Sequence, residues 1–127
     1  MGSRRPPDRP ILVVDDEADI RDLLGTVLRL HGYQVVEARN GVEAYNVARA
    51  ERPALILLDL MMPVMSGVEF RRAQLANPDI RKIPVIVISA HHDVKREVHA
   101  MKVVAFLVKP LDIEMLEQVV NKHAARH

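Results

Sequence analysis

The strongest constraint on the fold is a set of five short apolar runs that do not alternate with polar residues. A strand that is buried on both faces carries such a run, because neither face meets water. Between the runs, apolar residues recur at helical spacing; the first such stripe consists of Ile20, Leu23, Leu24, Val27 and Leu28. We therefore expect five strands, each followed by a helix. The expected strands are residues 11–14, 34–37, 54–58, 84–88 and 105–108.

Cap and turn residues mark the ends of the expected helices. Ser66 followed by Glu69 has the spacing of a capping box, which predicts the start of a helix. That helix is expected to stop before Asn77-Pro78, because the residue before a proline avoids the helical region. His31-Gly32 is expected to end the first helix. We interpret Arg71-Arg72 as part of the solvated face of the third helix.

Parallel strands joined by right-handed helical crossovers form an open, doubly wound α/β sheet with helices on both faces. Ligands of such sheets bind at the carboxyl ends of the strands. The residues at those ends therefore decide the function. They are Asp15 and Asp16 after the first strand, Asp59 after the third, Ser89 after the fourth and Lys109 after the fifth.

Three carboxylates at one edge of a sheet would repel one another strongly. Two unit charges about 4 Å apart cost roughly 4 kcal/mol at an effective dielectric near 20. Lys109 supplies one balancing charge, and a divalent cation would supply the other two. The oxygen-only ligand set and the room that it leaves for water and phosphate favour Mg²⁺ over Ca²⁺.

A carboxylate can itself be the nucleophile in phosphoryl transfer, which gives an acyl phosphate. In that reaction the protein mainly aligns donor and acceptor and neutralises the phosphoryl oxygens. Mg²⁺ and Lys109 suit the second task. A phosphoryl group on Asp59 would add negative charge and three acceptor oxygens, to one of which the Ser89 hydroxyl is placed to donate.

Composition excludes several classes of protein. Apolar runs such as residues 54–58 are too short to cross a membrane, and a chain without cysteine has no disulfide and fits the cytoplasm. A net charge of +1 and three per cent aromatic residues argue against direct binding of nucleic acid. Residues 1–9 are expected to be a disordered lead-in or a cloning remnant, and residues 10–127 to form one domain.

The residues at the strand ends, with the stretches that surround them, resemble the receiver domain of bacterial response regulators, over about residues 10–124. The resemblance implies a flavodoxin-like sheet with strand order 2-1-3-4-5. It also implies a signalling domain that takes a phosphoryl group from a sensor histidine kinase and catalyses only its own phosphorylation and slow dephosphorylation. The matching stretches are Val13-Val14-Asp15-Asp16-Glu17, residues 58–67 around Asp59, Ile88-Ser89-Ala90 and Val108-Lys109-Pro110.

Carried over by position, the resemblance makes Asp59 the phosphoacceptor. It makes Asp16, Asp59 and the backbone carbonyl of Met61 direct contacts of Mg²⁺, while Asp15 would act through metal-bound water. Lys109 becomes the cation that binds the phosphoryl group, and its bond to Pro110 is expected to be cis.

The resemblance also implies a switch. Ser89 would be the switch hydroxyl and Phe106 the aromatic residue that turns inward on activation, although Phe106 fits a fixed core aromatic equally well. The response would remodel the face formed by the fourth helix, fifth strand and fifth helix. An unknown output partner would bind this face, and a homodimer could form through it.

Three positions depart from the family pattern. Lys102-Val103 replaces a frequent Gly-Ala pair, so we expect the loop before the fifth strand to take another path. Phe106 has no hydroxyl where tyrosine is frequent, so its inward state would rest on packing alone. Met61 is apolar and has no side-chain group to hold an attacking water, which predicts a long-lived phosphoryl group.

Two other functions compete with this interpretation. A small magnesium-dependent phosphatase of the haloacid-dehalogenase type also uses an aspartyl nucleophile, but it carries that residue in a D-x-D motif after the first strand. Here the two acids are adjacent, and the candidate nucleophile Asp59 follows the third strand. A receiver-like domain that serves only as a scaffold is the other alternative, and the complete set of polar residues at the strand ends argues against it.

Overall fold

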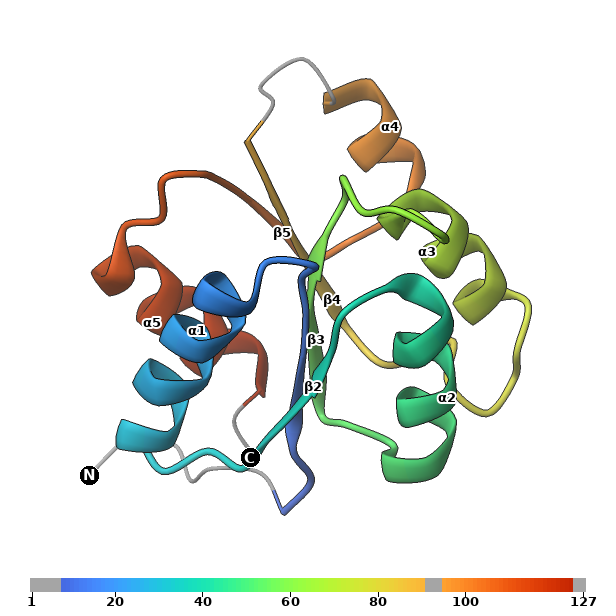
Figure 1. Cartoon of the computed structure of the whole chain (residues 1–127). Helices are drawn as coiled ribbons and strands as arrows, with labels where there is room; N and C mark the ends of the chain where they lie inside the picture. Colours follow the sequence, from blue (N-terminus) through green and yellow to red (C-terminus); the bar gives the residue numbers. More distant parts are fainter. Residues whose placement is uncertain (1–7, 91–94, 125–127) are drawn as a thin grey trace.

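The computed structural model describes residues 8–90 and 95–124, in which five parallel strands form one sheet of order β2-β1-β3-β4-β5. Helices and strands alternate along the chain, so the predicted doubly wound fold is confirmed (Figure 1). The elements are β1 (Ile11–Val14), α1 (Ala18–Leu30), β2 (Val35–Ala38), α2 (Gly41–Glu51), β3 (Leu55–Asp59), α3 (Gly67–Leu75), β4 (Val85–Ser89), α4 (Lys95–Ala100), β5 (Ala105–Val108) and α5 (Ile113–Ala124).

The strand boundaries differ slightly from those expected. β1 and β5 begin and end as predicted, whereas β2, β3 and β4 each lie one residue further along the chain. Asp59 and Ser89 are therefore the last residues of their strands rather than the first residues beyond them. The register pairs Asp59 with Ile88 and Ser89 with Val108, which places these strand ends side by side.

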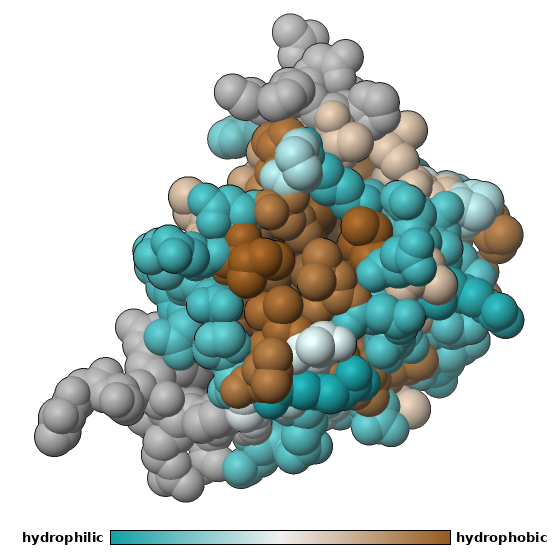
Figure 2. Space-filling view, turned by 60° about the vertical axis from the view of Figure 1, so that its left-hand side comes forward, coloured by the Kyte–Doolittle hydropathy of each residue, from teal (hydrophilic) through white to brown (hydrophobic). Residues whose placement is uncertain are grey.

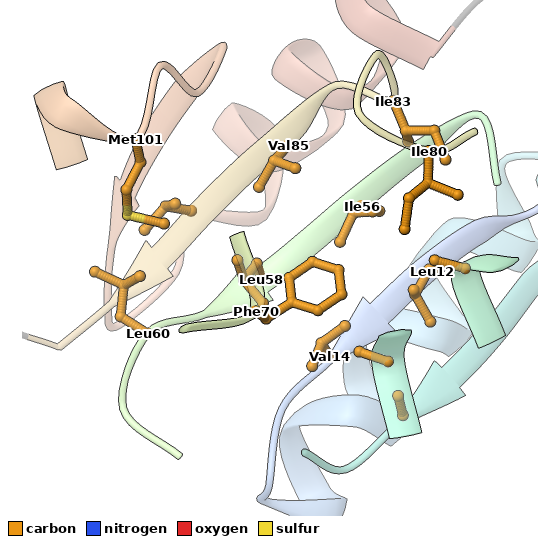
Figure 3. Close-up of a cluster of buried hydrophobic side chains, with 14 of the residues drawn as sticks. Leu12, Val14, Ile56, Leu58, Leu60, Phe70, Ile80, Ile83, Val85 and Met101 are labelled. Carbon is orange, nitrogen blue, oxygen red and sulfur yellow. The ribbon is translucent and has the colours of Figure 1, made fainter. Parts of the chain in front are cut away.

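Two separate hydrophobic cores lie on the two faces of the sheet. Alternate strand residues face α1 and α5 on one side and α2, α3 and α4 on the other, as the two groups of helices in Figure 1 show. In the second core the fully buried Phe70 of α3 packs over the central strands, close to Ile56, Leu58 and Val14 (Figure 3). Because both faces are covered, the central strands are apolar without alternation.

The ends of the helices largely follow the sequence. α3 begins with the predicted capping box between Ser66 and Glu69 and ends before Asn77. α1 ends at Leu30, and Gly32 takes the left-handed conformation that follows it. The expected buried stripe of α1 is only partly confirmed, because Leu24 and Leu28 are buried whereas Leu23 is 48% exposed.

One prediction about α3 is wrong. Arg71 is buried, and its guanidinium donates to the Met101 carbonyl at 2.9 Å and to the Lys102 carbonyl at 3.1 Å. Helical spacing explains this, since Arg71 and Gln74 lie on the same face of α3 as Phe70. Only Arg72 lies on the solvated face as expected.

The loop before β5 contains a backbone conformation that favours glycine. Lys102 has a φ of 55°, in the left-handed region, which costs a residue with a Cβ atom about 1 kcal/mol. The expectation of a different loop path stays a prediction. No helix of residues 8–90 and 95–124 is long and apolar enough to span a membrane. Residues 1–7 of the expected lead-in and residues 125–127 lie outside the described residues.

Candidate functional site

Polar residues from four strands gather at the carboxyl edge of the sheet. Asp15 follows β1 directly, Asp59 ends β3, Ser89 ends β4 and Lys109 follows β5. The Lys109 amide donates to the Ser89 carbonyl at 2.8 Å, which fixes the start of the loop after β5 against the end of β4. The Lys109-Pro110 peptide bond is cis, as the resemblance implied.

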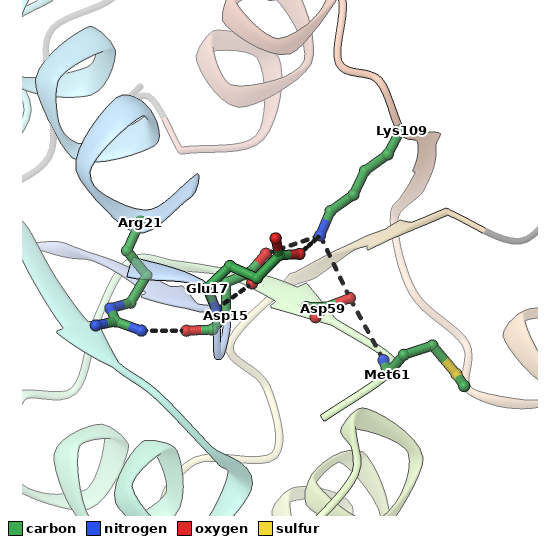
Figure 4. Close-up of polar contacts among 6 residues, drawn as sticks. All are labelled: Asp15, Glu17, Arg21, Asp59, Met61 and Lys109. Atoms are coloured by element: carbon green, nitrogen blue, oxygen red, sulfur yellow. Dashed lines mark hydrogen bonds and ion pairs between the residues drawn. The ribbon is translucent and has the colours of Figure 1, made fainter. Parts of the chain in front are cut away.

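Lys109 lies among the acids of this edge. Its Nζ donates to Asp15 Oδ2 at 3.0 Å and lies 3.8 Å from Asp59 Oδ1 and 3.7 Å from Glu17 Oε1 (Figure 4). Its side chain is 16% exposed, so solvent screens these charges only in part. Burial alone would lower the pKa of Lys109, but the hydrogen bond that it donates to Asp15 and the charges of Asp59, Asp15 and Glu17 raise that pKa above its usual value.

Asp15 is held on every side. Its amide donates to the Ala38 carbonyl at 3.1 Å, and its Oδ1 accepts from the Glu17 amide at 2.9 Å. Arg21 of α1 donates to the Asp15 carbonyl at 2.6 Å, as Figure 4 shows. The N-cap residue of α1 is Glu17, so Asp15 is not the N-cap of this helix.

Asp59 is buried at the end of β3 beside like charges. Burial raises its pKa from the ordinary value of 3.8 to about 6, and the charges of Asp15 and Asp16 act in the same direction. Lys109 and the Met61 amide, which donates to Asp59 Oδ1 at 3.4 Å, lower the pKa in part. The carboxylate is therefore ionised at neutral pH, although its burial and the neighbouring acids disfavour the ionised form.

The acidic residues of this edge fit a hard divalent cation. Asp15, Asp16 and Glu17 each offer a carboxylate oxygen, and these oxygens lie within 4.8 Å of one another. Together with Asp59 they carry four formal negative charges, and Lys109 contacts three of these acids, Asp15, Glu17 and Asp59. Lys109 offsets one of these four charges, so a negative surplus remains at this edge. An oxygen-only set with this surplus matches Mg²⁺.

Close packing places the start of α3 directly against the backbone of Asp59 and Leu60. A Cβ atom on Gly67 would lie 2.6 Å from the Asp59 carbonyl oxygen and 2.8 Å from Leu60 Cα, so only glycine fits. The Gly67 amide donates to the Leu60 carbonyl at 3.1 Å. The chain after Asp59 is thereby fixed, and the Met61 side chain, which is 57% exposed, points away from the acids (Figure 4).

The two expected switch residues lie on neighbouring strands. Ser89 is fully buried at the end of β4, while Phe106 of β5 is partly buried against the core beneath α3 and α4. Phe106 also borders an open groove of about 620 Å³ that is lined by Val98, His99, Ala100, Lys102, Val103 and Ala105. Their roles as switch residues stay a prediction.

Sequence reasoning missed three contributors to this edge. Glu17 contacts Lys109, Arg21 holds the Asp15 backbone, and Gly67 permits the close approach of α3. The sequence offered a signal only for Glu17, as the third acid of a consecutive run. The contacts of Arg21 and Gly67 depend on how α1 and α3 pack, which residue spacing does not reveal.

Comparison with known proteins gives a consistent family match. A family model described as response regulator receiver domain matches residues 11–121. The chain is 36% identical over 116 residues to sporulation initiation phosphotransferase F of Bacillus subtilis, covering 89% of this chain and 91% of that protein. It spans less than half the length of several relatives that are named transcriptional regulators.

Solved structures show the same likeness. Chemotaxis protein CheY4 of Vibrio cholerae superposes with a TM-score of 0.84 at 31% identity, covering 91% of this chain and 98% of that one. Response regulator protein TrrA of Thermotoga maritima, solved in complex with Mg²⁺ and BeF, gives a TM-score of 0.81 at 30% identity, with coverages of 90% and 97%.

Proposed function

Because this chain belongs to the response regulator receiver family, we propose that Asp59 is the residue on which it accepts the activating phosphoryl group. The chain is a phosphorylation-activated signalling receiver rather than a classical enzyme. The observation that carries the assignment is the position of Asp59, buried at a strand end with Lys109 3.8 Å from its carboxylate.

The proposed chemistry is a single displacement at phosphorus. One Asp59 oxygen forms a bond to the phosphorus of a phosphohistidine, and the phosphorus–nitrogen bond breaks. The imidazole nitrogen leaves with the bonding electron pair and takes up a proton. The attack needs ionised Asp59, and a pKa of about 6 leaves most of the carboxyl groups ionised at pH 7.5.

Lys109 and the acids prepare this step. Lys109 is positioned to neutralise a phosphoryl oxygen, since its Nζ already lies between Asp15 and Asp59. Asp16 and Asp59, with the Met61 carbonyl, would hold Mg²⁺ directly, and Asp15 would do so through water. When bound, the ion supplies positive charge that stabilises the transferring phosphoryl group. Glu17 adds to the acidic surplus that attracts it.

The proposed response begins at Ser89 and ends at the face of α4, β5 and α5. The Ser89 hydroxyl would donate to a phosphoryl oxygen, and Phe106, which pairs with Val87 one strand away, would follow. The groove beside Phe106 offers space into which its ring would move, or from which it would turn inward. The output partner and any homodimer would use this face.

The proposed donor is a sensor histidine kinase. On the side of the molecule that carries α1 and α5, hydrophobic side chains gather in a patch bordered by hydrophilic ones (Figure 2). Leu23, Leu30 and Met115 are 48%, 79% and 49% exposed on these helices. Exposed apolar patches of this kind mark contact surfaces.

We assign residues 10–127 to the receiver domain. Its cytoplasmic location stays a prediction, as does the lack of direct nucleic-acid contact.

The apolar Met61 predicts a long lifetime for the phosphoryl group. Its side chain points away from the acids, so it holds no water against the phosphorus (Figure 4). Replacing Met61 with Asn should speed the loss of the phosphoryl group, measured as the decay of labelled protein in the absence of a phosphatase. Equal decay in the Met61→Asn variant and the natural protein would remove this part of the proposal.

Mass spectrometry of the intact protein after treatment with acetyl phosphate and Mg²⁺ tests the assignment. We expect one phosphoryl adduct, mapped to Asp59, and no turnover of free phosphomonoesters. An adduct on another residue would overturn the assignment of Asp59. Turnover of phosphomonoesters would instead favour the haloacid-dehalogenase type of phosphatase, although the chain lacks the D-x-D motif of that class.

A further inference from the structure

Two buried polar side chains of α3, Arg71 and Gln74, form a hydrogen-bond network with neighbouring loops. Gln74 is fully buried, and its Nε2 donates to the carbonyls of Ile80 at 2.9 Å and Ile83 at 3.0 Å. Its Oε1 accepts from Arg71 Nη1 at 2.8 Å. Arg71 in turn donates from Nε and Nη2 to two carbonyls of the segment that joins α4 to β5. The network therefore fastens this segment to α3.

Burying the guanidinium of Arg71 is expensive unless its donors are satisfied. Among the side chains that the structure describes, its partners are an amide oxygen and two backbone carbonyls, not a carboxylate. Burial lowers the pKa of Arg71, but a guanidinium stays charged at neutral pH. Withdrawal of the two carbonyls would leave a buried cation with one remaining hydrogen bond.

The segment that Arg71 holds, around Met101 and Lys102, leads to the face of α4, β5 and α5. Lys102, whose carbonyl accepts from Arg71, has the left-handed φ of 55° and also lines the groove beside Phe106. Val104 then donates to the Val85 carbonyl at 2.9 Å, and β5 begins one residue later. At the other end of β5, the Lys109 amide is bonded to Ser89. β5 thus runs from the segment held by Arg71 to the phosphoryl site.

We infer that Arg71 is a latch: it positions the α4–β5 segment on α3 and restrains the rearrangement by which phosphorylation of Asp59 reaches the output face. Gln74 keeps the guanidinium on the α3 side, so outward movement of the segment must break both carbonyl bonds. The effect on phosphorylation rests on the proposed function of Asp59. The restraint on the segment does not.

Amide hydrogen exchange of the unphosphorylated protein tests the restraint. Arg71→Met keeps the length of the side chain but removes its donors, and Arg72→Met is the matched control on the solvated face of the same helix. We expect exchange over residues 98–106 to accelerate at least about tenfold in Arg71→Met, while β1 and β2 keep their rates. Uniform acceleration, or none, would overturn the latch. If Arg71→Met does not fold, Arg71→Lys, with one donor group, should show a smaller acceleration confined to the same segment.

Labelling by acetyl phosphate tests the link to the site. If phosphorylation favours the rearranged state, a variant that populates this state more often has a larger fraction of molecules ready to accept the phosphoryl group. We expect Arg71→Met to label several-fold faster than the natural protein and Arg72→Met to label at the natural rate. Unchanged or slower labelling of Arg71→Met would overturn the coupling. Failure of all three proteins to label would instead contradict the assignment of Asp59, and the exchange measurement would still decide the latch.

Discussion

The central strand ends and the segment before β5 are built in opposite ways. β1 and β3 are buried along their whole length, and Asp15 is fixed by its amide, its carbonyl and both carboxylate oxygens. β5 is only partly buried throughout, and the segment before it combines a left-handed Lys102 with carbonyls held by one side chain. The proposed function thus places the phosphoryl chemistry at the more buried edge and the response in the less buried region, which is the part expected to open more easily.

Removing the proposed nucleophile should have the largest effect at this edge of the sheet. Asp59→Asn is expected to abolish labelling by acetyl phosphate, because an amide does not attack phosphorus. It should also stabilise the metal-free protein by about 1–2 kcal/mol in urea unfolding at pH 7.5, since it relieves a buried charge among acids. Asp22→Asn, an exposed acid of α1, is the control and should do neither. Retained labelling in Asp59→Asn would place the acceptor elsewhere.

Removing the cation should be the next largest change. Lys109→Met is expected to slow labelling about 100-fold, as loss of one charge-stabilising donor does in other transfer sites. It should also destabilise the protein by about 2 kcal/mol at pH 7.5, because Asp15 loses its buried partner. Lys122→Met on the exposed side of α5 controls for the loss of a lysine. Labelling at the natural rate would show that Lys109 takes no part.

The pH dependence follows from the raised pKa of Asp59. Below about pH 6 the carboxyl takes up a proton, so Mg²⁺ affinity and the labelling rate should fall, approaching tenfold for each pH unit. Without metal, the folded protein holds this proton between about pH 3.8 and 6 where the unfolded chain does not. The contribution of Asp59 to metal-free stability should therefore decrease as pH rises through that window. A flat difference in stability from Asp59→Asn across this range would contradict the raised pKa.

The smallest expected effect lies in the segment before β5. Lys102→Gly should stabilise the protein by about 0.5 kcal/mol, because glycine takes the left-handed region without strain but has more freedom when unfolded. The carbonyl that accepts from Arg71 is kept. Lys102→Ala retains a Cβ atom and should give no gain in urea unfolding. Equal effects of the two substitutions would show that the conformation is not strained.

The sequence predicts the sheet and the acidic edge well for a physical reason. Fully covered strands need continuous apolar runs, and polar residues can end those runs only at the edge of the sheet. The apolar runs therefore predict that Asp15, Asp59 and Lys109 lie together, and the structure brings them into contact. Boundaries moved by one residue in three strands, which residue type alone does not fix.

The network around Arg71 could not be predicted in the same way. Charged residues in a helix normally face water, so Arg71 and Arg72 appeared equivalent. Their difference arises because the Arg71 guanidinium reaches two carbonyls about thirty residues away in the chain, which local spacing does not encode. The left-handed conformation of Lys102 could not be predicted from the sequence for the same reason, since the loop imposes it and the residue type does not.

The acids at the strand ends carry more negative formal charge than Lys109 can balance, so the site should bind a divalent cation. Titration of the ¹⁵N-labelled protein with Mg²⁺ at pH 7.5, followed by NMR, tests it most directly. We expect saturable shifts of the amide signals of residues 15–17, 59–61 and 109, which are lost or greatly weakened in Asp59→Asn. Absence of saturable shifts at these residues in the natural protein would contradict it.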